Sequence, residues 1–512
     1  MAIDLGGTNL RVSSVELHGN SQYSVARSKV VIPPQVMTAP TYKHLFHFIA
    51  THVLHFMQEH RPDDMSIWET AVKDGPVTAE IRRKHFYSVG FTFSFTFNQH
   101  ALDRGRLLYW TKAFNIVDAL HKDPAAMLQE ALDDLRLPLV VTALTNDTVG
   151  TLAARAYSTP GHTRPLLGAI FGTGTNGAYM EPLSNITKLH SDPEVLRNNW
   201  GMHETMALNT EWGGFDDKLE VLPTTRYDDL LDASSVNPKS QHFEKRVSGM
   251  YLGELLRLVM LDGMQSGLAP FDMEISEASN LYIPDSIDSS LLSLVVADDS
   301  PQLDLAREAI SKTLNASPVS HSDARAVQIL AAAIGRRAAR LSAVAMAGVV
   351  IRSGRLQSTK EQGEKEHEED VSYTTWCMGY LEPLYQLFTR TFVRVVRWAS
   401  AKGDYQDSSK GTIESGDESS PKGLHGPAAV KRGPMATVSA SVDSMTRETA
   451  VIDIGVDGSL FEFFPNFEAN IRQAFREIPQ IGSEGEARIR IGMAKEGSGV
   501  GAALIAWSAL RG

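Results

Sequence analysis

Six short groups of glycines and polar residues follow one another along the chain in an order that could assemble a phosphate-transfer site. Glycines allow backbone N–H groups to approach phosphate oxygens, and a carboxylate can accept a proton from a hydroxyl. No group is specific alone, but together they describe a phosphate cradle, a base and a pocket for a hydroxyl-rich ligand. In chain order they are Ile3-Asp4-Leu5-Gly6-Gly7-Thr8-Asn9, Trp110-Thr111-Lys112, Asn146-Asp147-Thr148, Gly172-Thr173-Gly174-Thr175-Asn176, Asn209-Thr210-Glu211-Trp212-Gly213 and Gly455-Val456-Asp457-Gly458-Ser459.

The first group places a carboxylate at the end of a predicted strand, beside a tight turn. Asp4 precedes Gly6 and Gly7, whose backbone could approach phosphate, and Thr8 adds a hydroxyl. Asp4 could hold Mg²⁺ directly or through water. An ordinary glycine turn in a hairpin explains the same residues equally well when the group is taken alone.

The fourth group offers a second phosphate-type turn. Residues 172–177 match the G-x-G-x-x-G pattern of dinucleotide-binding folds, but that pattern requires a long helix directly afterwards. Residues 178–182 predict a short strand instead, so we interpret the group as a phosphate turn with Asn176 facing the substrate. Residues 2–18 and 166–181 both predict strand, turn and strand. This repetition indicates a duplicated α/β fold in which each half supplies one turn to a cleft.

The third group is the best candidate for a base. Asn146 and Asp147 lie between a predicted buried strand, residues 139–144, and a predicted helix, residues 147–157. Helix capping is the alternative, and it would be preferred without the other groups, because Asn and Asp favour that position. Other polar side chains from several segments could bind a hydroxyl-rich ligand, although each is also typical of a surface. They are Ser94, Thr111, Lys112, Asn176, Glu211 and Glu254.

Composition narrows the class of protein. The 512 residues carry a net charge of −12, with no long basic run in the region of the motifs, which argues against nucleic acid as the main partner. The single cysteine, Cys377, cannot form an intrachain disulfide and is typical of a reducing, cytoplasmic compartment. No signal peptide is visible, and no uncharged apolar run is long enough to span a bilayer.

The remaining pattern predicts helices separated by one irregular region. Five histidines mark the helix at 42–59, but His47 and His55 are two turns, about 12 Å, apart. That spacing is too long for one metal ion, so we interpret the histidines as a solvated face. Further helices are predicted at 114–136, 147–157, 325–350, 466–478 and 499–510.

Residues 355–449 interrupt this order and predict an insertion rather than a third folded domain. Residues 356–370 are highly charged, and residues 402–434 are rich in Ser, Gly, Lys and Asp, which predicts disorder. Residues 373–399 are apolar and aromatic but contain three arginines. They fit locally packed or poorly structured chain better than a basic amphipathic helix that contacts a membrane or a partner.

These motifs resemble those of the hexokinase family, especially fungal-type hexokinases and glucokinases. The resemblance covers residues 1–354 and resumes over about 450–512. The segment 91–95 with Trp110-Thr111-Lys112 is similar to the family's sugar loop, and 248–254 to its signature helix. Residues 455–460 are similar to its adenosine motif, and 497–504 to its closing helix.

The resemblance implies a two-lobed α/β fold of the actin-like ATPase and sugar kinase type, with ribonuclease H-like duplicated lobes and a cleft between them. Residues 1–145 would form the small lobe. Residues 146–512 would form the large lobe, which carries the insertion. The last helix, 499–510, would return to the small lobe. Closure of the lobes would exclude water, which otherwise competes as acceptor.

The resemblance also implies an activity: ATP-dependent phosphorylation of glucose, or of fructose or mannose, at the 6-hydroxyl, the first step of glycolysis. Asp147 would be the base, Lys112 a second catalytic residue and Mg²⁺-ATP the donor, in a cytoplasmic monomer or homodimer. By position, the sugar would be bound by Ser94, Thr111, Lys112, Asn146, Asp147, Asn176, Glu211 and Glu254. Mg²⁺-ATP would be bound by Asp4, Gly6, Gly7, Thr8, Asn9, Gly172, Thr173, Gly174, Asp457, Gly458 and Ser459.

Four departures from the family pattern keep an alternative open. Thr96 replaces a proline, Ala113 replaces a glycine, the chain begins almost at the first phosphate strand, and about 95 residues are inserted. A catalytically impaired sugar sensor that binds glucose would tolerate these changes, and a gene-model error would explain the last two. An actin-like or chaperone-type ATPase would share the phosphate turns, but it has no reason to carry Trp-Thr-Lys or Asn-Thr-Glu-Trp-Gly.

Overall fold

The structure is a computed structural model of the 512-residue chain. It describes residues 1–19, 21–73, 81, 85–159, 164–189, 205–266, 271–357 and 451–509. The predictions made for the insertion at 355–449 therefore concern residues that, apart from 355–357, lie outside the described part of the chain.

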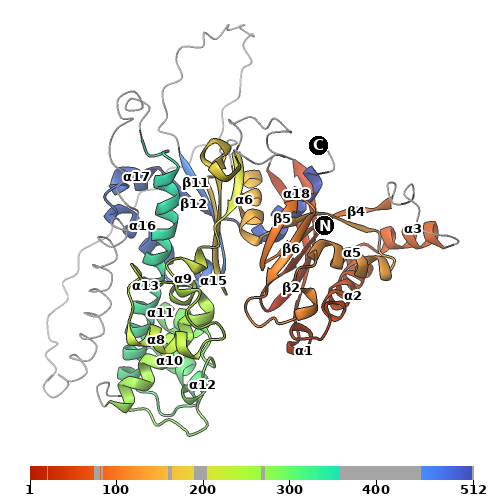
Figure 1. Cartoon of the computed structure of the whole chain (residues 1–512). Helices are drawn as coiled ribbons and strands as arrows, with labels where there is room; N and C mark the ends of the chain where they lie inside the picture. The colour runs from red at the N-terminus through yellow and green to blue at the C-terminus, as the bar shows by residue number, and fades with distance from the viewer. Residues whose placement is uncertain are drawn as a thin grey trace, which may run out of the picture.

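Two five-stranded sheets of the same design organise the molecule (Figure 1). The first has the strand order β3-β2-β1-β4-β7 and the second β10-β9-β8-β11-β12. In each, an antiparallel hairpin around a glycine turn is followed by parallel strands, so the predicted duplicated α/β fold is confirmed. The first sheet comprises β1 (Ala2–Leu5), β2 (Asn9–Gly19), β3 (Gln22–Val31), β4 (Tyr87–Phe93) and β7 (Leu139–Thr145). The second comprises β8 (Leu167–Phe171), β9 (Thr175–Pro182), β10 (Thr205–Asn209), β11 (Ile452–Asp457) and β12 (Ile489–Met493).

Helices bury an apolar face on each sheet, as the sequence periodicity predicts. On α2 (Tyr42–His60), Leu45, Ile49, Val53 and Phe56 enter the core of the first sheet. Among the described residues, no group of three or more His, Cys, Asp or Glu side chains is arranged to hold a metal ion. The helices around the second sheet include α6 (Asp147–Ser158), α8 (Arg226–Ser234), α9 (His242–Val247), α10 (Gly249–Gln265), α11 (Ser289–Ala297), α12 (Asp304–Leu314), α13 (His321–Arg352), α15 (Ser459–Phe463), α16 (Phe467–Glu477) and α17 (Gly482–Arg488). No helix in the described ranges is both long enough and apolar enough to cross a membrane.

One helix was predicted wrongly. The pattern at 114–136 forms only a short 3-10 turn, Val117–Ala119, and then α5 (Pro124–Asp134). Proline is tolerated in the first turn of a helix but not in its interior, so a helix cannot run continuously through Pro124. Asp123 starts the helix instead, because its side chain accepts a hydrogen bond from the N–H of Ala125.

The final helix, α18 (Gly497–Ser508), lies against the first sheet although it follows the second in sequence. In Figure 1 it is drawn in blue among the red and orange elements of the first sheet. The hydroxyl of Thr92 on β4 donates to the carbonyl of Ser498 at 3.1 Å, and that of Thr142 on β7 to the carbonyl of Ala506 at 3.3 Å. The exact division into lobes at residue 145 stays a prediction, but the last helix does contact the first sheet.

Candidate active site

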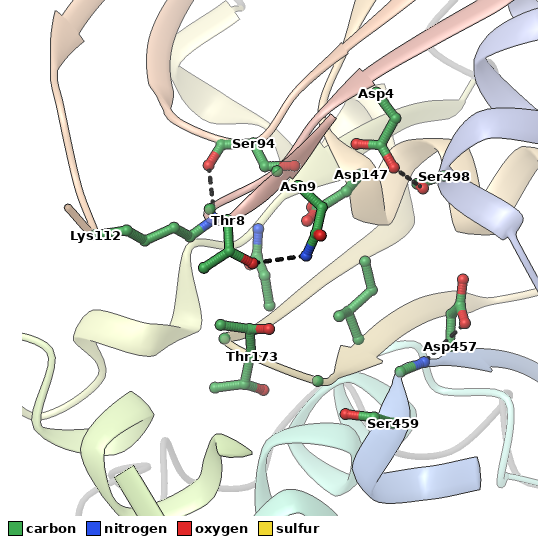
Figure 2. Close-up of a pocket in the computed structure, with 18 of the residues that line it drawn as sticks. Asp4, Thr8, Asn9, Ser94, Lys112, Asp147, Thr173, Asp457, Ser459 and Ser498 are labelled. Carbon is green, nitrogen blue, oxygen red and sulfur yellow. Dashed lines mark hydrogen bonds between the residues drawn. The ribbon is translucent and has the colours of Figure 1, made fainter. Parts of the chain in front are cut away.

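A cleft of about 590 Å³ lies between the two glycine turns and brings together most of the predicted site (Figure 2). In Figure 2, Thr8, Asn9, Ser94 and Lys112 lie on one side, and Thr173 and Ser459 on the other. Every predicted site residue except Glu254 lines this cleft. Those residues are Asp4, Gly6, Gly7, Thr8, Asn9, Ser94, Thr111, Lys112, Asn146, Asp147, Gly172, Thr173, Gly174, Asn176, Glu211, Asp457, Gly458 and Ser459.

The candidate base is the first residue of α6. Strand β7 ends at Thr145, and Asn146 caps the helix: its side-chain oxygen accepts hydrogen bonds from the N–H of Thr148 at 2.9 Å and from its hydroxyl at 2.6 Å. Oδ1 of Asp147 also accepts a hydrogen bond from the N–H of Thr148, at 2.8 Å, so both residues cap the helix. Asp147 lines the cleft as well, so capping, the alternative from the sequence, does not exclude a role as base.

The surroundings of Asp147 favour its protonated form more than water would. Removal of solvent around the carboxyl is the largest effect and raises its pKa from the ordinary 3.8 to about 6. Lys112 opposes this rise, whereas the charges of Asp4 and Glu211 add to it, and a hydrogen bond from Ser94 opposes it again. A carboxylate with a pKa of about 6 is a better proton acceptor than an ordinary aspartate and is still ionised at neutral pH.

Lys112 crosses the cleft beside the first phosphate turn. Its ammonium donates to the carbonyl of Ser94 at 3.1 Å and lies 5.3 Å from the centre of the Phe95 ring. Its alkyl chain passes over Gly7, where an added Cβ would lie only 2.4 Å from Cδ of Lys112. Glycine at this position therefore lets a cation and the turn occupy the same corner of the cleft.

A network of amides and one carboxylate faces this corner from the second sheet. The amide nitrogen of Asn176 donates to Oδ1 of Asn209 at 2.7 Å and to Oε1 of Glu211 at 3.3 Å, and Asn209 donates to the same oxygen at 2.7 Å. Glu211 has a left-handed backbone, with φ of 50°. The sequence prediction missed the role of Asn209 as a support, although Asn209 lies in the same motif as Glu211.

The structure corrects the prediction for Glu254. This carboxylate is buried on α10, where it accepts two hydrogen bonds from Arg257, at 2.7 and 2.6 Å, and a third from the N–H of Asp285 at 2.8 Å. The face of α10 that carries Glu254 and Arg257 turns toward the loop before α11 and away from the cleft. Glu254 is therefore a structural residue.

Glu244 on α9 occupies the place expected for Glu254. It lines the cleft, and Oε2 accepts a hydrogen bond from the N–H of Thr175 at 3.0 Å. Burial raises its pKa, and the hydrogen bond from Thr175 and the charge of Lys112 oppose that rise. Nothing local distinguishes the two acids in the sequence, because both lie within a few residues of the Ser248-Gly249 turn.

The adenosine-type turn touches the second phosphate turn. Gly458 has φ of 116°, and an added Cβ would lie 2.4 Å from the carbonyl oxygen of Phe171, so only glycine fits there. Asp457 accepts hydrogen bonds from the N–H of Gly458 at 2.8 Å and of Gly497 at 3.0 Å. Although it lines the cleft, Asp457 also ties the end of β11 to the start of α18.

Comparisons with known proteins identify the family. Two family models described as hexokinase match this chain, one over residues 1–157 and the other over 166–423 and 433–508. The chain belongs to the hexokinase family. This hexokinase is thus a sugar phosphotransferase with the two-lobed sugar kinase fold that its motifs predicted.

The relatives are similar over nearly the whole chain. A glucokinase of Aspergillus niger is 40% identical over 99% of this chain and 84% of its own length. Glucokinase-1 of Saccharomyces cerevisiae is 33% identical over 99% of this chain and 83% of its own. Among solved structures, a hexokinase from Schistosoma mansoni complexed with glucose has a TM-score of 0.63 at 26% identity, covering 99% of this chain and 84% of that one.

Asp4 has the surroundings expected of a residue that helps to hold a magnesium ion. Its Oδ2 accepts a hydrogen bond from Arg11 at 3.0 Å. The same oxygen accepts one from the hydroxyl of Ser498 at 2.9 Å (Figure 2). Within the described residues, Oδ1 has no hydrogen-bond donor and remains available. Mg²⁺ is bound in nucleotide sites by one or two carboxylates together with substrate phosphates, and this donor set fits that pattern. Arg11 and Ser498 were not predicted from the sequence.

Proposed function

We propose that this hexokinase transfers the γ-phosphoryl group of ATP to the 6-hydroxyl of glucose, with Asp147 as the general base. The observation that carries the proposal is the meeting of Asp147, Lys112 and both phosphate turns in one cleft. The similarity to glucokinases over 99% of the chain favours glucose as the acceptor. Fructose and mannose are the alternative acceptors to be tested beside it.

The sugar would be held by groups that suit several hydroxyls at once. Carboxylates accept from hydroxyls, whereas amides both donate and accept, so a mixed set can distinguish the positions around a ring. We assign Glu244 to this set in place of Glu254, because Glu244 lines the cleft and Glu254 is saturated elsewhere. The full set is Ser94, Thr111, Lys112, Asn146, Asp147, Asn176, Glu211 and Glu244.

The proton and the phosphoryl group would move in one step. As O6 attacks the γ-phosphorus, the bond from phosphorus to the β,γ-bridging oxygen breaks, ADP leaves, and the O6 proton passes to Asp147. The raised pKa of Asp147 suits this proton transfer. Lys112, which lines the same cleft, would offset negative charge that develops on the transferred group.

ATP would lie across the two glycine turns, with its phosphates near Gly7, Thr8 and Thr173 and its nucleoside toward Gly458 and Ser459. A magnesium ion bound with the nucleotide would neutralise phosphate charge and link the phosphates to Asp4. Closure of the cleft would exclude water, so that the sugar hydroxyl is the acceptor.

The sensor alternative was favoured by the short start, the insertion and the changes in the sugar loop, and of these the loop lies within the described residues. Thr96, which replaces proline, starts strand β5 (Thr96–Ala101), pairs with Tyr109 on β6 (Arg104–Tyr109) and still lines the cleft. The sugar loop therefore has support from a hairpin. We further propose a cytoplasmic monomer or homodimer, and the single cysteine favours a reducing compartment.

The test is ADP release from Mg²⁺-ATP by the purified 512-residue chain, with and without glucose, beside Asp147→Ala. We expect glucose-dependent release by the wild type, loss of release in the variant, and glucose binding within about threefold of wild type. Folded wild-type protein that binds glucose but releases no ADP would refute the kinase proposal. Unchanged turnover in Asp147→Ala would refute the assignment of the base.

A further inference from the structure

A buried ion cluster joins the helix that carries the base to the strand that carries the adenosine turn. Asp453 on β11 is fully buried and accepts two hydrogen bonds from Arg155 on α6, from Nε at 2.9 Å and from Nη2 at 2.7 Å. Arg490 on β12 donates to the same carboxylate at 2.6 Å, and the hydroxyl of Thr159 donates at 3.2 Å. The carboxylate is thus held by three side chains, from α6, from the residue that follows α6 and from β12.

Glycines on the sheet make room for this cluster. An added Cβ on Gly455 would lie 2.7 Å from Cβ of Arg155, and one on Gly492 would lie 2.2 Å from its Nη1. The arginine therefore lies flat across β11 and β12, and any side chain at these two positions would displace it. A guanidinium whose Nε and Nη2 both donate to one carboxylate has a defined position and direction.

The electrostatics show that Asp453 is held as an anion. Burial alone would raise the pKa of Asp453, but the hydrogen bonds and charges of Arg155 and Arg490 outweigh burial and hold the pKa below its ordinary value. The cluster is therefore an ionised contact, and removal of Asp453 would leave the guanidinium of Arg155 without its carboxylate in the interior.

From this anchor, the helix and the strand extend over matching lengths into the cleft. Asp147 lies eight residues before Arg155 on α6, about 12 Å along the helix axis. Asp457 lies four residues after Asp453 on β11, about 13 Å along the strand. The chain runs in opposite directions along α6 and β11, so the start of α6 and the end of β11 both reach the cleft, which Asp147 and Asp457 line. A shift of Arg155 relative to Asp453 would therefore change the distance between Asp147 and the Asp457-Gly458 turn.

We propose that Asp453, with Arg155 and Arg490, is a positioning site for phosphoryl transfer that sets the register of Asp147 against the Asp457-Gly458 turn. The inference rests on the proposed function. Neither arginine touches the cleft, so the site acts through α6 and β11. Transfer depends on alignment of the reacting atoms, and small misplacements lower its rate steeply.

The test compares Arg155→Lys with Arg337→Lys. Lysine keeps the charge but loses the two-point contact. Arg337 on α13 donates to both oxygens of Asp228 at 2.9 Å, in a buried pair on helices away from the base and the phosphate turns, and is a matched control. Both variants should lower the Tm. Only Arg155→Lys should lower kcat, by about 10- to 100-fold, with the glucose KM within about twofold of wild type.

Hydrogen exchange supplies a readout that does not depend on activity. In Arg155→Lys, amide exchange should become faster both in the first turn of α6 and at residues 457–463, whereas Arg337→Lys should leave both segments as in the wild type. A folded Arg155→Lys protein with wild-type kcat and wild-type exchange would overturn the inference. If the wild type itself releases no ADP with glucose, the proposed function fails, and the exchange measurement still decides on the anchor.

Discussion

The raised pKa of Asp147 means that the base lowers the stability of the enzyme that uses it. The folded protein binds the Asp147 proton more tightly than the unfolded chain does, because the pKa rises from 3.8 to about 6 on folding. Between these two pH values the stability contributed by this group falls as pH rises, and above pH 6 the whole loss is present. At about 1.4 kcal/mol for each pH unit, ionised Asp147 lowers the free energy of unfolding by about 3 kcal/mol.

Asp147→Asn removes the charge and should recover this loss. We expect the variant to be inactive and more stable than wild type at pH 7.5 by up to about 3 kcal/mol. At pH 5.0, where most folded molecules carry the proton, the same arithmetic leaves a gain of about half that size. The measurement is urea unfolding followed by tryptophan fluorescence at both pH values.

The control replaces a carboxylate of the same type that is solvated. Asp299 is exposed between α11 and α12, so Asp299→Asn should change stability little at either pH. If Asp147→Asn is no more stable than wild type at pH 7.5, or if its gain is the same at pH 5.0, the carboxylate is not desolvated and the reasoning is wrong.

Three further predictions follow from the cleft. Glu244→Ala should raise the glucose KM at least about tenfold, whereas Glu254→Ala should leave the glucose KM unchanged. Glu254→Ala should instead destabilise the fold by about 3–5 kcal/mol, because it removes the carboxylate that pairs with Arg257. Steady-state kinetics measures the first effect and urea unfolding the second. The kcat/KM for glucose should fall about tenfold for each pH unit below about 6, because protonated Asp147 cannot accept the sugar proton; a flat profile between pH 5 and 7 would contradict the assignment. Gly458→Ala should raise the KM for ATP more than that for glucose, because the new Cβ meets Phe171 and displaces the adenosine turn; equal effects on both constants would contradict it.

The sequence predicts best what local chemistry determines. Around Asp4 and Gly7, two glycines follow a carboxylate at the end of a strand. This pattern predicts a turn with exposed backbone N–H groups. Asn146 and Asp147 mark a helix start from their residue types alone. The periodicity of α2 locates its buried face, because Leu45, Ile49 and Val53 recur at helical spacing.

Prediction from the sequence fails where two candidate site residues differ only in the direction in which their side chains point. Glu244 and Glu254 belong to neighbouring helices, and their roles depend on which way α9 and α10 turn. The prediction of one long helix before β7 was wrong because Asp123 and Pro124 are residues typical of a helix N-terminus, and α5 begins there. The pair Arg155 and Asp453 is separated by 298 residues, so nothing in either local sequence reveals it.

The contact between Asp4 and Ser498 has a consequence for how the enzyme is made. The two residues are 494 positions apart, and the helix that begins at Gly497 also packs on the first sheet. A nascent chain therefore lacks the wall of the cleft that Ser498, Gly499 and Val500 line until α18 has been synthesised. Activity should appear only after α18 has left the ribosome and packed on the first sheet.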